Sequence, residues 1–251
     1  MTPLQLTELR FLYLPLFALS LWLFTGCEQT QEEAVDNSPV VVNKTTDFEL
    51  TGDGGAPNWD ETSWVPIPQR RTTGLTAETR VKTLYSDTGI YFLFYCEDDT
   101  LNASMQADFM DLWHEDVVEA FLWTEETFPV YFEYEISPLN YELPILIPNN
   151  DGEFLGWRPW HYEGDRRTRH ATSVQGGAKE TSAAITSWMA EFFIPYELLT
   201  PLGNVPPASG TEWRVNMYRV DYDGGESSSW EWQETTGSFH QYEVFGTFRF
   251  E

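Results

Sequence analysis

The sequence contains only two cysteines in 251 residues, Cys27 and Cys96. Cys27 ends an apolar N-terminal run and is assigned to lipid attachment below, so Cys96 has no partner for a disulfide bond. Cys96 lies in the apolar segment Phe92-Leu93-Phe94-Tyr95-Cys96 and is predicted to be a small, buried hydrophobic side chain. Disulfide-stapled folds are thereby excluded, and the protein must be stabilised by its core.

Basic residues are also few. The 14 Lys and Arg stand against 40 Asp and Glu, which gives a formal net charge of −26. Such a charge repels nucleic acids and anionic lipid headgroups, so both are excluded as partners. It is compatible with neutral glycans and with divalent cations, whereas sulfated or uronic-acid glycans fit less well.

Sequence patterns typical of catalysis are missing. No nucleophile elbow is present, and the four histidines show no zinc-ligand spacing. A glycosidase needs two carboxylates that flank a cleft, whereas Glu115, Asp116 and Glu119 are crowded into one short segment. We therefore predict that the protein is not an enzyme.

A twelve-residue calcium loop is absent as well. Asp53, Asp98, Asp99 and Asp108 are hard oxygen donors in predicted turns and could hold a structural calcium ion. Solvated turn residues are the favoured interpretation of these four aspartates, so we predict no cofactor and no metal.

The N-terminal segment predicts export. Residues 11–24 are almost wholly apolar and run into Phe24-Thr25-Gly26-Cys27. This run is short for a membrane-spanning helix, and small residues before a cysteine are what lipoprotein signal peptidase requires. Residues 1–26 are therefore predicted to be a lipoprotein signal peptide with Cys27 as the lipidated first residue; an uncleaved membrane anchor is the alternative.

The rest of the chain divides into a tether and one domain. Residues 27–45 are polar and acidic without periodicity, which predicts a flexible tether. Residues 46–251 have the size of a single all-β domain. In either N-terminal interpretation this domain is exported and tethered to a membrane.

No long amphipathic helical pattern is present, whereas β-favouring aromatics are abundant, with 11 Trp, 12 Tyr and 17 Phe. A short helical turn is predicted at 195–199, and the Pro- and aromatic-rich segment 140–162 is predicted to be an irregular insertion on the rim that carries recognition. Alternation and composition predict an all-β, two-sheet antiparallel sandwich of jelly-roll type. Its nine predicted strands are 48–51, 78–85, 89–97, 117–123, 130–137, 168–174, 187–194, 212–221 and 245–250.

The most informative stretch is Trp113-His114-Glu115-Asp116-Val117-Val118-Glu119-Ala120-Phe121. Its second half alternates with a period of two, which is typical of a strand. Trp113 comes just before this strand, where a loop would present an indole at the edge of the sheet. Glu119 is a charged residue inside an otherwise apolar strand, and such a carboxylate is either paired or used.

This stretch resembles the central signature of the family 9 carbohydrate-binding modules and their DOMON-like relatives. Four other segments resemble the family in the same order, and the resemblance runs from about residue 46 to the end. It implies a β-sandwich that binds sugars and does not cleave them. The four segments are Gly52-Asp53-Gly54 with Trp59 and Trp64, residues 88–94 with Asp98, residues 188–195, and Phe239-His240 with Phe245-Gly246.

By this resemblance, Trp113 and Phe239 are the two aromatic side chains that sandwich a terminal sugar, with Phe239 where the family has Trp. A pyranose stacks its C–H groups on such flat faces and offers its hydroxyls to polar side chains at the edge of the ring. Glu119 corresponds to the family's carboxylate that accepts hydrogen bonds from those hydroxyls. The alternative is a structural ion pair of Glu119 with Arg214 or Arg219.

Further residues are assigned to the same site. Tyr218 and Arg219 lie on a strand similar to one that supplies polar contacts, and His240 lies beside Phe239. Where the family's sugar-reading arginine would be, this chain has Tyr131-Phe132-Glu133-Tyr134-Glu135, and Arg219 could replace it only if its strand is bulged. Trp232 could extend the aromatic platform together with Trp230, Trp157, Trp160 and His161, although rim packing is the favoured alternative.

The resulting prediction is an exported, lipid-anchored carbohydrate-binding protein of a bacterial envelope, on the outer membrane. Its ligand is predicted to be a neutral glycan, and its role polysaccharide capture and carbohydrate catabolism beside a glycoside hydrolase. One alternative is a haem-binding electron-transfer module using Met105, Met110, His114 and His240, for which a Cys-x-x-Cys-His motif is absent. The other is a purely structural surface lipoprotein.

Overall fold

The structure is a computed structural model that describes residues 38–73, 76–151, 153–225 and 227–251. The predicted signal peptide, Cys27 and most of the predicted tether lie outside these residues. In the described part of the chain, no helix has the length and apolar character needed to cross a membrane.

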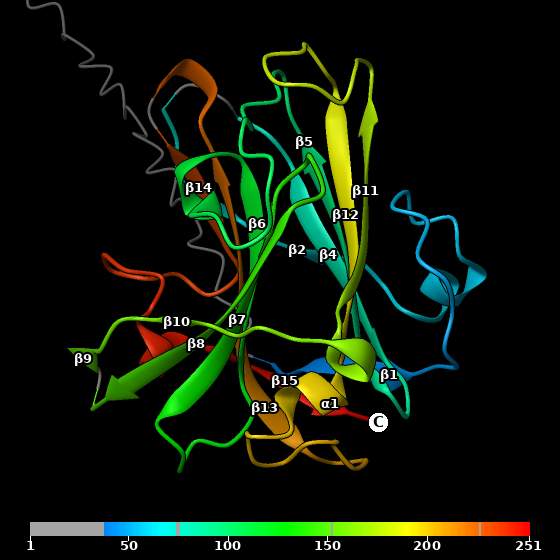
Figure 1. Ribbon diagram of the computed structural model, residues 1–251, viewed down its shortest axis with the longest axis vertical. Coiled ribbons are helices and arrows are strands. Elements are labelled where there is room, and N and C mark those ends of the chain that lie inside the picture. The colour runs from blue at the N-terminus through cyan, green and yellow to red at the C-terminus, as the bar shows by residue number, and fades with distance from the viewer. Residues whose placement is uncertain (1–37, 74–75, 152, 226) are drawn as a thin grey trace, which may run out of the picture. The chain divides into compact units, whose positions relative to one another are not determined.

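Fifteen strands build the described domain, and the order of the strands is continuous through two packed layers (Figure 1). The first sheet runs β10–β8–β7–β6–β13–β15, with β14 beside β13, β3 beside β14 and β9 beside β8. The second sheet runs β4–β5–β12–β11, with β2 beside β4. The strands are β1 Val40–Lys44, β2 Val65–Pro66, β3 Gln69–Arg71, β4 Thr79–Tyr85, β5 Gly89–Glu97, β6 Val117–Trp123, β7 Val130–Ile136, β8 Glu142–Asn150, β9 Glu153–Phe154, β10 Arg158–Pro159, β11 Arg169–Gln175, β12 Ser187–Pro195, β13 Glu212–Asp221, β14 Ser228–Glu231 and β15 Gly246–Phe250.

Strand β1 joins the two sheets. Its first half runs parallel to β15 of the first sheet, with Val40 opposite Phe248, and its second half runs parallel to β4 of the second sheet, with Asn43 opposite Leu84. The other strand pairs are antiparallel. The predicted tether 27–45 was therefore too long at its C-terminal end, because the β-branched run of β1 is part of the sandwich.

The core lies between the sheets. Phe92, Phe94 and Phe192 stack across β5 and β12 of the second sheet, with ring centroids 5.0 to 6.5 Å apart. Tyr134 of the first sheet packs on Phe192 from the other side at 4.5 Å. Cys96 is free and buried in this core, as predicted. This arrangement confirms the predicted β-sandwich.

Helices are few and short. The single α-helix α1, Tyr196–Leu199, follows Pro195 and confirms the helical turn predicted at 195–199. Five 3-10 helices lie in the loops, and one of them, η2, flanks the pocket described below. They are η1 Pro57–Glu61, η2 Leu112–His114, η3 Gly164–Arg166, η4 Asp223–Gly225 and η5 Tyr242–Val244.

The segment 140–162 is mostly sheet, so its irregular conformation was wrongly predicted. Its first part forms β8, which pairs with β7 over seven residues, although it contains Pro144 and Pro148. On its other side β8 meets only the two-residue strands β9 and β10, and a strand near the edge of a sheet tolerates proline.

Residues 48–51 were also wrongly predicted as a strand. Phe48 stacks on Tyr91 at 4.3 Å, and the backbone N–H of Thr51 donates to the buried carboxylate of Glu191 at 2.7 Å instead of joining a ladder. The same carboxylate accepts from the N–H of Gly52 and from Trp59 Nε1. A buried glutamate therefore fixes this loop on the second sheet.

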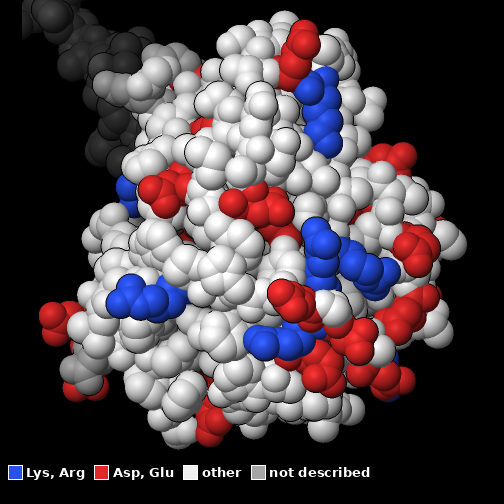
Figure 2. Space-filling view, viewed as in Figure 1, with Lys and Arg blue, Asp and Glu red and all other residues white. Residues whose placement is uncertain are grey.

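The outer face of the first sheet is covered rather than exposed. A second hydrophobic cluster forms there between β6, β7, β8 and β13 and the loops that cross them, and it includes Val117, Phe121 and Tyr131. Acidic groups are scattered over the face seen in Figure 2 and are not gathered into one patch. The covered outer face is where the candidate site lies.

Candidate functional site

A pocket of about 380 Å³ opens over the outer face of the first sheet. Strands β6, β7 and β8 form its floor, and the loops around η2, β9 and residues 237–240 form its walls. It is lined by Arg71, Trp113, Glu119, Phe121, Glu133, Ile145, Phe154, Trp157, Gly237, Ser238, Phe239 and His240.

Four of the seven residues predicted for the site line this one pocket: Trp113, Glu119, Phe239 and His240. They come from three separate segments of the chain, η2, β6 and the loop before β15. Their assembly follows from strand order, because β6 and β13 are adjacent and the loop after β14 returns across both.

Both predicted aromatic walls are half-buried and supported from behind. The ring of Trp113 meets that of Trp157 edge to face, with centroids 5.6 Å apart. Phe239 lies flat on the buried ring of Tyr218 at 4.1 Å and 11°. Trp157 and Tyr218 therefore fix the orientations of Trp113 and Phe239, and both of these rings line the pocket.

The third wall centres on His240. Its ring stacks on Phe154 at 4.2 Å and packs on Phe121 at 5.5 Å, so both faces are covered. Its Nδ1 is 2.6 Å from the hydroxyl of Tyr131. Burial lowers the pKa of His240 to about 4, which keeps this imidazole neutral near pH 7.

The floor carries carboxyl groups without cationic partners. Glu119 is 2% exposed and Glu133 4% exposed, and no Lys or Arg of the described residues forms a salt bridge with either of them. The predicted alternative partners are wrong: Arg214 donates to the carbonyl of Phe245 and pairs with Glu126 at 3.4 Å, and Arg219 lies on the other face of the sheet.

Burial governs the charge state of this floor. It raises the pKa of Glu119 well above the ordinary value, and the nearby Glu133 raises it further. Burial likewise raises the pKa of Glu133 to about 8. Glu135, directly opposite Glu119 on the neighbouring strand, has its pKa raised by burial and then by Glu119 and Glu133. The floor is therefore a set of coupled carboxyl groups that resists full ionisation.

The other three predicted residues do not line the pocket. Tyr218 is buried one layer behind Phe239. Trp232 is buried in the core between the sheets, where it packs on Phe248 at 5.7 Å. Trp230 and Trp160 pack with the core and do not extend an aromatic platform for a sugar. Trp157, in contrast, lines the pocket.

The prediction of Arg219 as a ligand-contacting cation is wrong. The pairing of β13 with β6 is continuous from Arg214 to Val220, without the bulge that would turn Arg219 outward. Its guanidinium is fully buried instead, 3.1 Å from Asp98 and 2.5 Å from Asp221, with its carbon 4.4 Å above the ring of Trp230.

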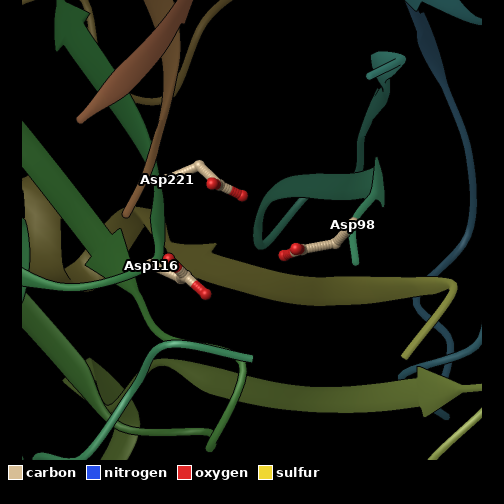
Figure 3. A group of neighbouring side chains, drawn as sticks. All are labelled: Asp98, Asp116 and Asp221. Atoms are coloured by element: carbon tan, nitrogen blue, oxygen red, sulfur yellow. The ribbon is translucent and has the colours of Figure 1, made fainter. Parts of the chain in front are cut away.

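Asp98, Asp116 and Asp221 surround this guanidinium, and their carboxylates point toward one another (Figure 3). One oxygen of each lies within 4.8 Å of the others, a spacing that could hold a metal ion. The residues present suit a guanidinium better, because Nη2 of Arg219 already contacts two of the three carboxylates. Asp98 is 1% exposed, so its interpretation as a solvated turn residue was wrong, whereas Asp53, Asp99 and Asp108 are exposed.

Seven lining residues were not assigned by the sequence: Arg71, Phe121, Glu133, Ile145, Phe154, Gly237 and Ser238. Glu133 could have been found, because it lies opposite Phe121 and shares the outward phase of the two strands. Arg71 and Phe154 could not, because β3 and β9 are short and reach the pocket through tertiary contacts. Of the residues proposed for haem, only His240 is among those that line the pocket.

Comparisons with known proteins show the family of the chain. Residues 51–251 match the carbohydrate family 9 binding domain-like family. A proposed carbohydrate-binding protein from Bacteroides uniformis ATCC 8492 has a similar structure, with a TM-score of 0.69, 16% identity, and coverage of 85% of this chain and 99% of that one. No protein in the curated set is significantly similar in sequence.

A family 9 carbohydrate-binding module from Caldicellulosiruptor kristjanssonii is also similar, in its complexes with cellotriose and with glucose. Both comparisons have a TM-score of 0.61 and 16% identity and cover 85% of this chain, with 94% and 96% of the module covered. Carbohydrate-binding modules of family 9 are non-catalytic, and the protein is not an enzyme. The match over residues 51–251 shows that this chain belongs to the carbohydrate family 9 binding domain-like family.

Proposed function

We propose that this protein binds carbohydrate in the pocket on the outer face of the first sheet. The observation that carries the proposal is the meeting of Trp113, Phe239 and Glu119 in one pocket of a family member. The cellotriose and glucose complexes of the Caldicellulosiruptor kristjanssonii module support sugars as the ligand class.

The chemistry of the lining suits a sugar ring. The indole of Trp113 and the phenyl ring of Phe239 offer flat apolar faces to the C–H groups of a pyranose. Glu119 and Glu133 offer oxygens that can accept hydrogen bonds from the ring's hydroxyls. A pocket of about 380 Å³ suits a small ligand or the terminal unit of a longer glycan.

Alanine substitutions at the two walls test this proposal. Trp113→Ala and Phe239→Ala should each weaken binding about five- to a hundredfold, since aromatic stacking of this kind is worth roughly 1–3 kcal/mol. Binding is measured by isothermal titration with cellotriose and glucose, on the full chain in a detergent without a sugar headgroup.

Trp64→Ala is the matched control, because Trp64 is also half-buried but packs in a hydrophobic cluster of the second sheet. It should leave sugar affinity unchanged. Equal losses in all three variants, or normal binding by Trp113→Ala, would remove these walls from the site.

We further propose that the protein acts at a bacterial envelope as an exported lipoprotein. Lipid on Cys27 would hold the domain at the outer membrane, where it would capture polysaccharide for a glycoside hydrolase. The support is the apolar run of residues 11–24 followed by Gly26-Cys27.

A further inference from the structure

Three carboxyl groups cluster at the bottom of the pocket: Glu119, Glu133 and Glu135, here called the glutamate trio. Glu119 lies opposite Glu135 on the neighbouring strand, and Glu133 lies one outward position further along. Glu119 and Glu133 line the pocket, whereas Glu135 is fully buried behind them.

The trio lacks hydrogen-bond donors. Oε2 of Glu133 and both carboxylate oxygens of Glu135 are buried and accept no hydrogen bond from outside the trio, within which the side chains of Glu133 and Glu135 contact each other. His240 Nδ1 is 3.8 Å from Glu133 and is committed to the hydroxyl of Tyr131. Other buried carboxylates of the described chain accept a hydrogen bond on at least one oxygen; Glu191, for example, accepts from Thr51, Gly52 and Trp59. The missing donors of the trio are therefore a local feature of the pocket.

The trio also lacks a cation. Arg71 is the one Lys or Arg among the described lining residues, and it is half exposed and 3.5 Å from the buried Glu231. The other ionisable groups that act on the trio from neighbouring elements are neutral or acidic. They are Tyr131, Tyr218, Tyr222, His240 and Asp111.

Ionised carboxylates in an enclosed site are costly, so these groups stay protonated unless a ligand supplies positive charge and N–H donors. Aromatic rings at the walls add attraction for a cation, because their faces are electron-rich. Trp113, Trp157 and Phe239 provide such rings beside the carboxyl groups.

We propose that the pocket is selective for an amino sugar, whose protonated amine lies against Glu119 and Glu133 while its ring stacks on the aromatic walls. This inference rests on the proposed carbohydrate binding and names the class of sugar. The net charge of the chain disfavours anionic glycans but does not distinguish neutral from cationic ones. The glutamate trio makes this distinction, because it favours a sugar that carries a positive charge. Burial keeps the free trio largely protonated near pH 7, so binding of the ammonium group favours the ionised form of a trio carboxyl, which releases its proton and accepts the ammonium's hydrogen bonds.

A panel of three sugars tests the charge directly, by isothermal titration of the full chain near pH 7. Glucosamine carries the amine, N-acetylglucosamine has the same ring with the charge removed, and glucose has a hydroxyl in its place. Glucosamine should bind at least about tenfold more tightly than either neutral sugar, as expected for a charge-assisted contact.

Glutamine variants locate the effect. Glu133→Gln and Glu119→Gln should each weaken glucosamine binding about tenfold more than they weaken glucose binding, so that the preference for glucosamine is lost. Glu153→Gln is the matched control, since Glu153 is exposed in β9 and changes the net charge equally. It should leave both affinities unchanged. Thermal unfolding of each variant reports whether the fold is retained.

The outcomes separate the two proposals. If glucose and cellotriose bind and glucosamine binds no better, the amino-sugar inference is wrong and carbohydrate binding stands. Retention of the glucosamine preference in Glu119→Gln and Glu133→Gln would also overturn the inference. If none of these sugars binds, the proposed function itself fails.

Discussion

Tyr218 stacks on Phe239 at 4.1 Å, and its hydroxyl donates to the Phe239 carbonyl at 2.8 Å. On the opposite wall, the hydroxyl of Tyr222 donates to the carbonyl of Trp113 at 2.9 Å. The two walls are thus held by two tyrosines at the end of β13, one in the strand and one just after it. One strand therefore sets the distance between both aromatic faces.

Removal of these hydroxyls should make the positions of Trp113 and Phe239 less fixed, while the aromatic rings of the two tyrosines stay packed. Tyr218→Phe and Tyr222→Phe should each reduce sugar affinity severalfold, and Tyr218→Phe should lower the free energy of unfolding by about 1 kcal/mol. Tyr95→Phe, on the second sheet, is the control and should not change affinity. Titration calorimetry and chemical unfolding measure the two effects; unchanged affinity in both variants would show that the walls are set by packing alone.

Arg219 should be essential to stability and irrelevant to ligand contact. Arg219→Met leaves Asp98, Asp116 and Asp221 facing one another without a cation, so the free energy of unfolding should fall by about 3–5 kcal/mol. Arg249→Met removes only an exposed pair with Glu251 and should change it by less than about 0.5 kcal/mol. Similar stabilities of the two variants would contradict this role for Arg219.

The same cluster makes a prediction about metal. Because the guanidinium of Arg219 already contacts two of the three aspartates, neither millimolar calcium nor a chelator should change the Tm of the unmodified protein. Differential scanning calorimetry in the two buffers measures this. A rise in Tm with calcium would place a cation in the cluster despite Arg219.

Regular alternation made the central strands predictable. Residues 89–97, 117–123 and 212–221 have the bounds expected from their apolar and β-branched patterns. Strand β8 was missed because Pro144 and Pro148 interrupt such a pattern, and its near-edge position is a property of the assembled sheet. Strand β14 was missed because its four residues, Ser228–Glu231, give no alternation of their own.

Site residues could be predicted from the sequence where alternation along their own strand decides which face of the sheet the side chain is on. Glu119 faces outward by the period of β6, and the same rule puts adjacent Tyr218 and Arg219 on opposite faces, which argued against using both. Phe154 and Arg71 reach the pocket from short strands whose positions depend on distant partners, so local sequence carries no signal for them. The lack of partners for Glu119, Glu133 and Glu135 is a tertiary property and is invisible in the sequence.

Export and lipidation are tested by one substitution. Cys27→Ser removes the sulfur that would carry the lipid, so the protein should leave the membrane fraction or accumulate as an unprocessed precursor. Fractionation and gel mobility, compared with Cys96→Ser as the control for loss of a thiol, measure this. A Cys27→Ser protein that fractionates and migrates like the unmodified one would exclude the lipid anchor.

The glutamate trio should make the protein less stable as pH rises. The pKa of Glu133 is raised from the unfolded value of about 4.3 to about 8, and those of Glu119 and Glu135 are raised in the same direction. A carboxyl group with a raised folded-state pKa stabilises the fold fully below its unfolded pKa, and this stabilisation is lost as pH rises through the folded value. Asp98 and Asp116, with pKa values raised mainly by burial to about 8 and about 7, act in the same direction.

His240 has the opposite sign, because its lowered pKa destabilises the fold only below its unfolded value of about 6.5. Between about pH 6.5 and pH 8.5, the Tm should therefore fall, and Glu133→Gln should both raise the Tm at the upper end and flatten the slope. Glu153→Gln, at an exposed position, should reproduce the slope of the unmodified protein. An equally steep slope in Glu133→Gln would mean that Glu133 is already ionised near neutral pH, and its carboxylate would then need a partner that the fold does not provide.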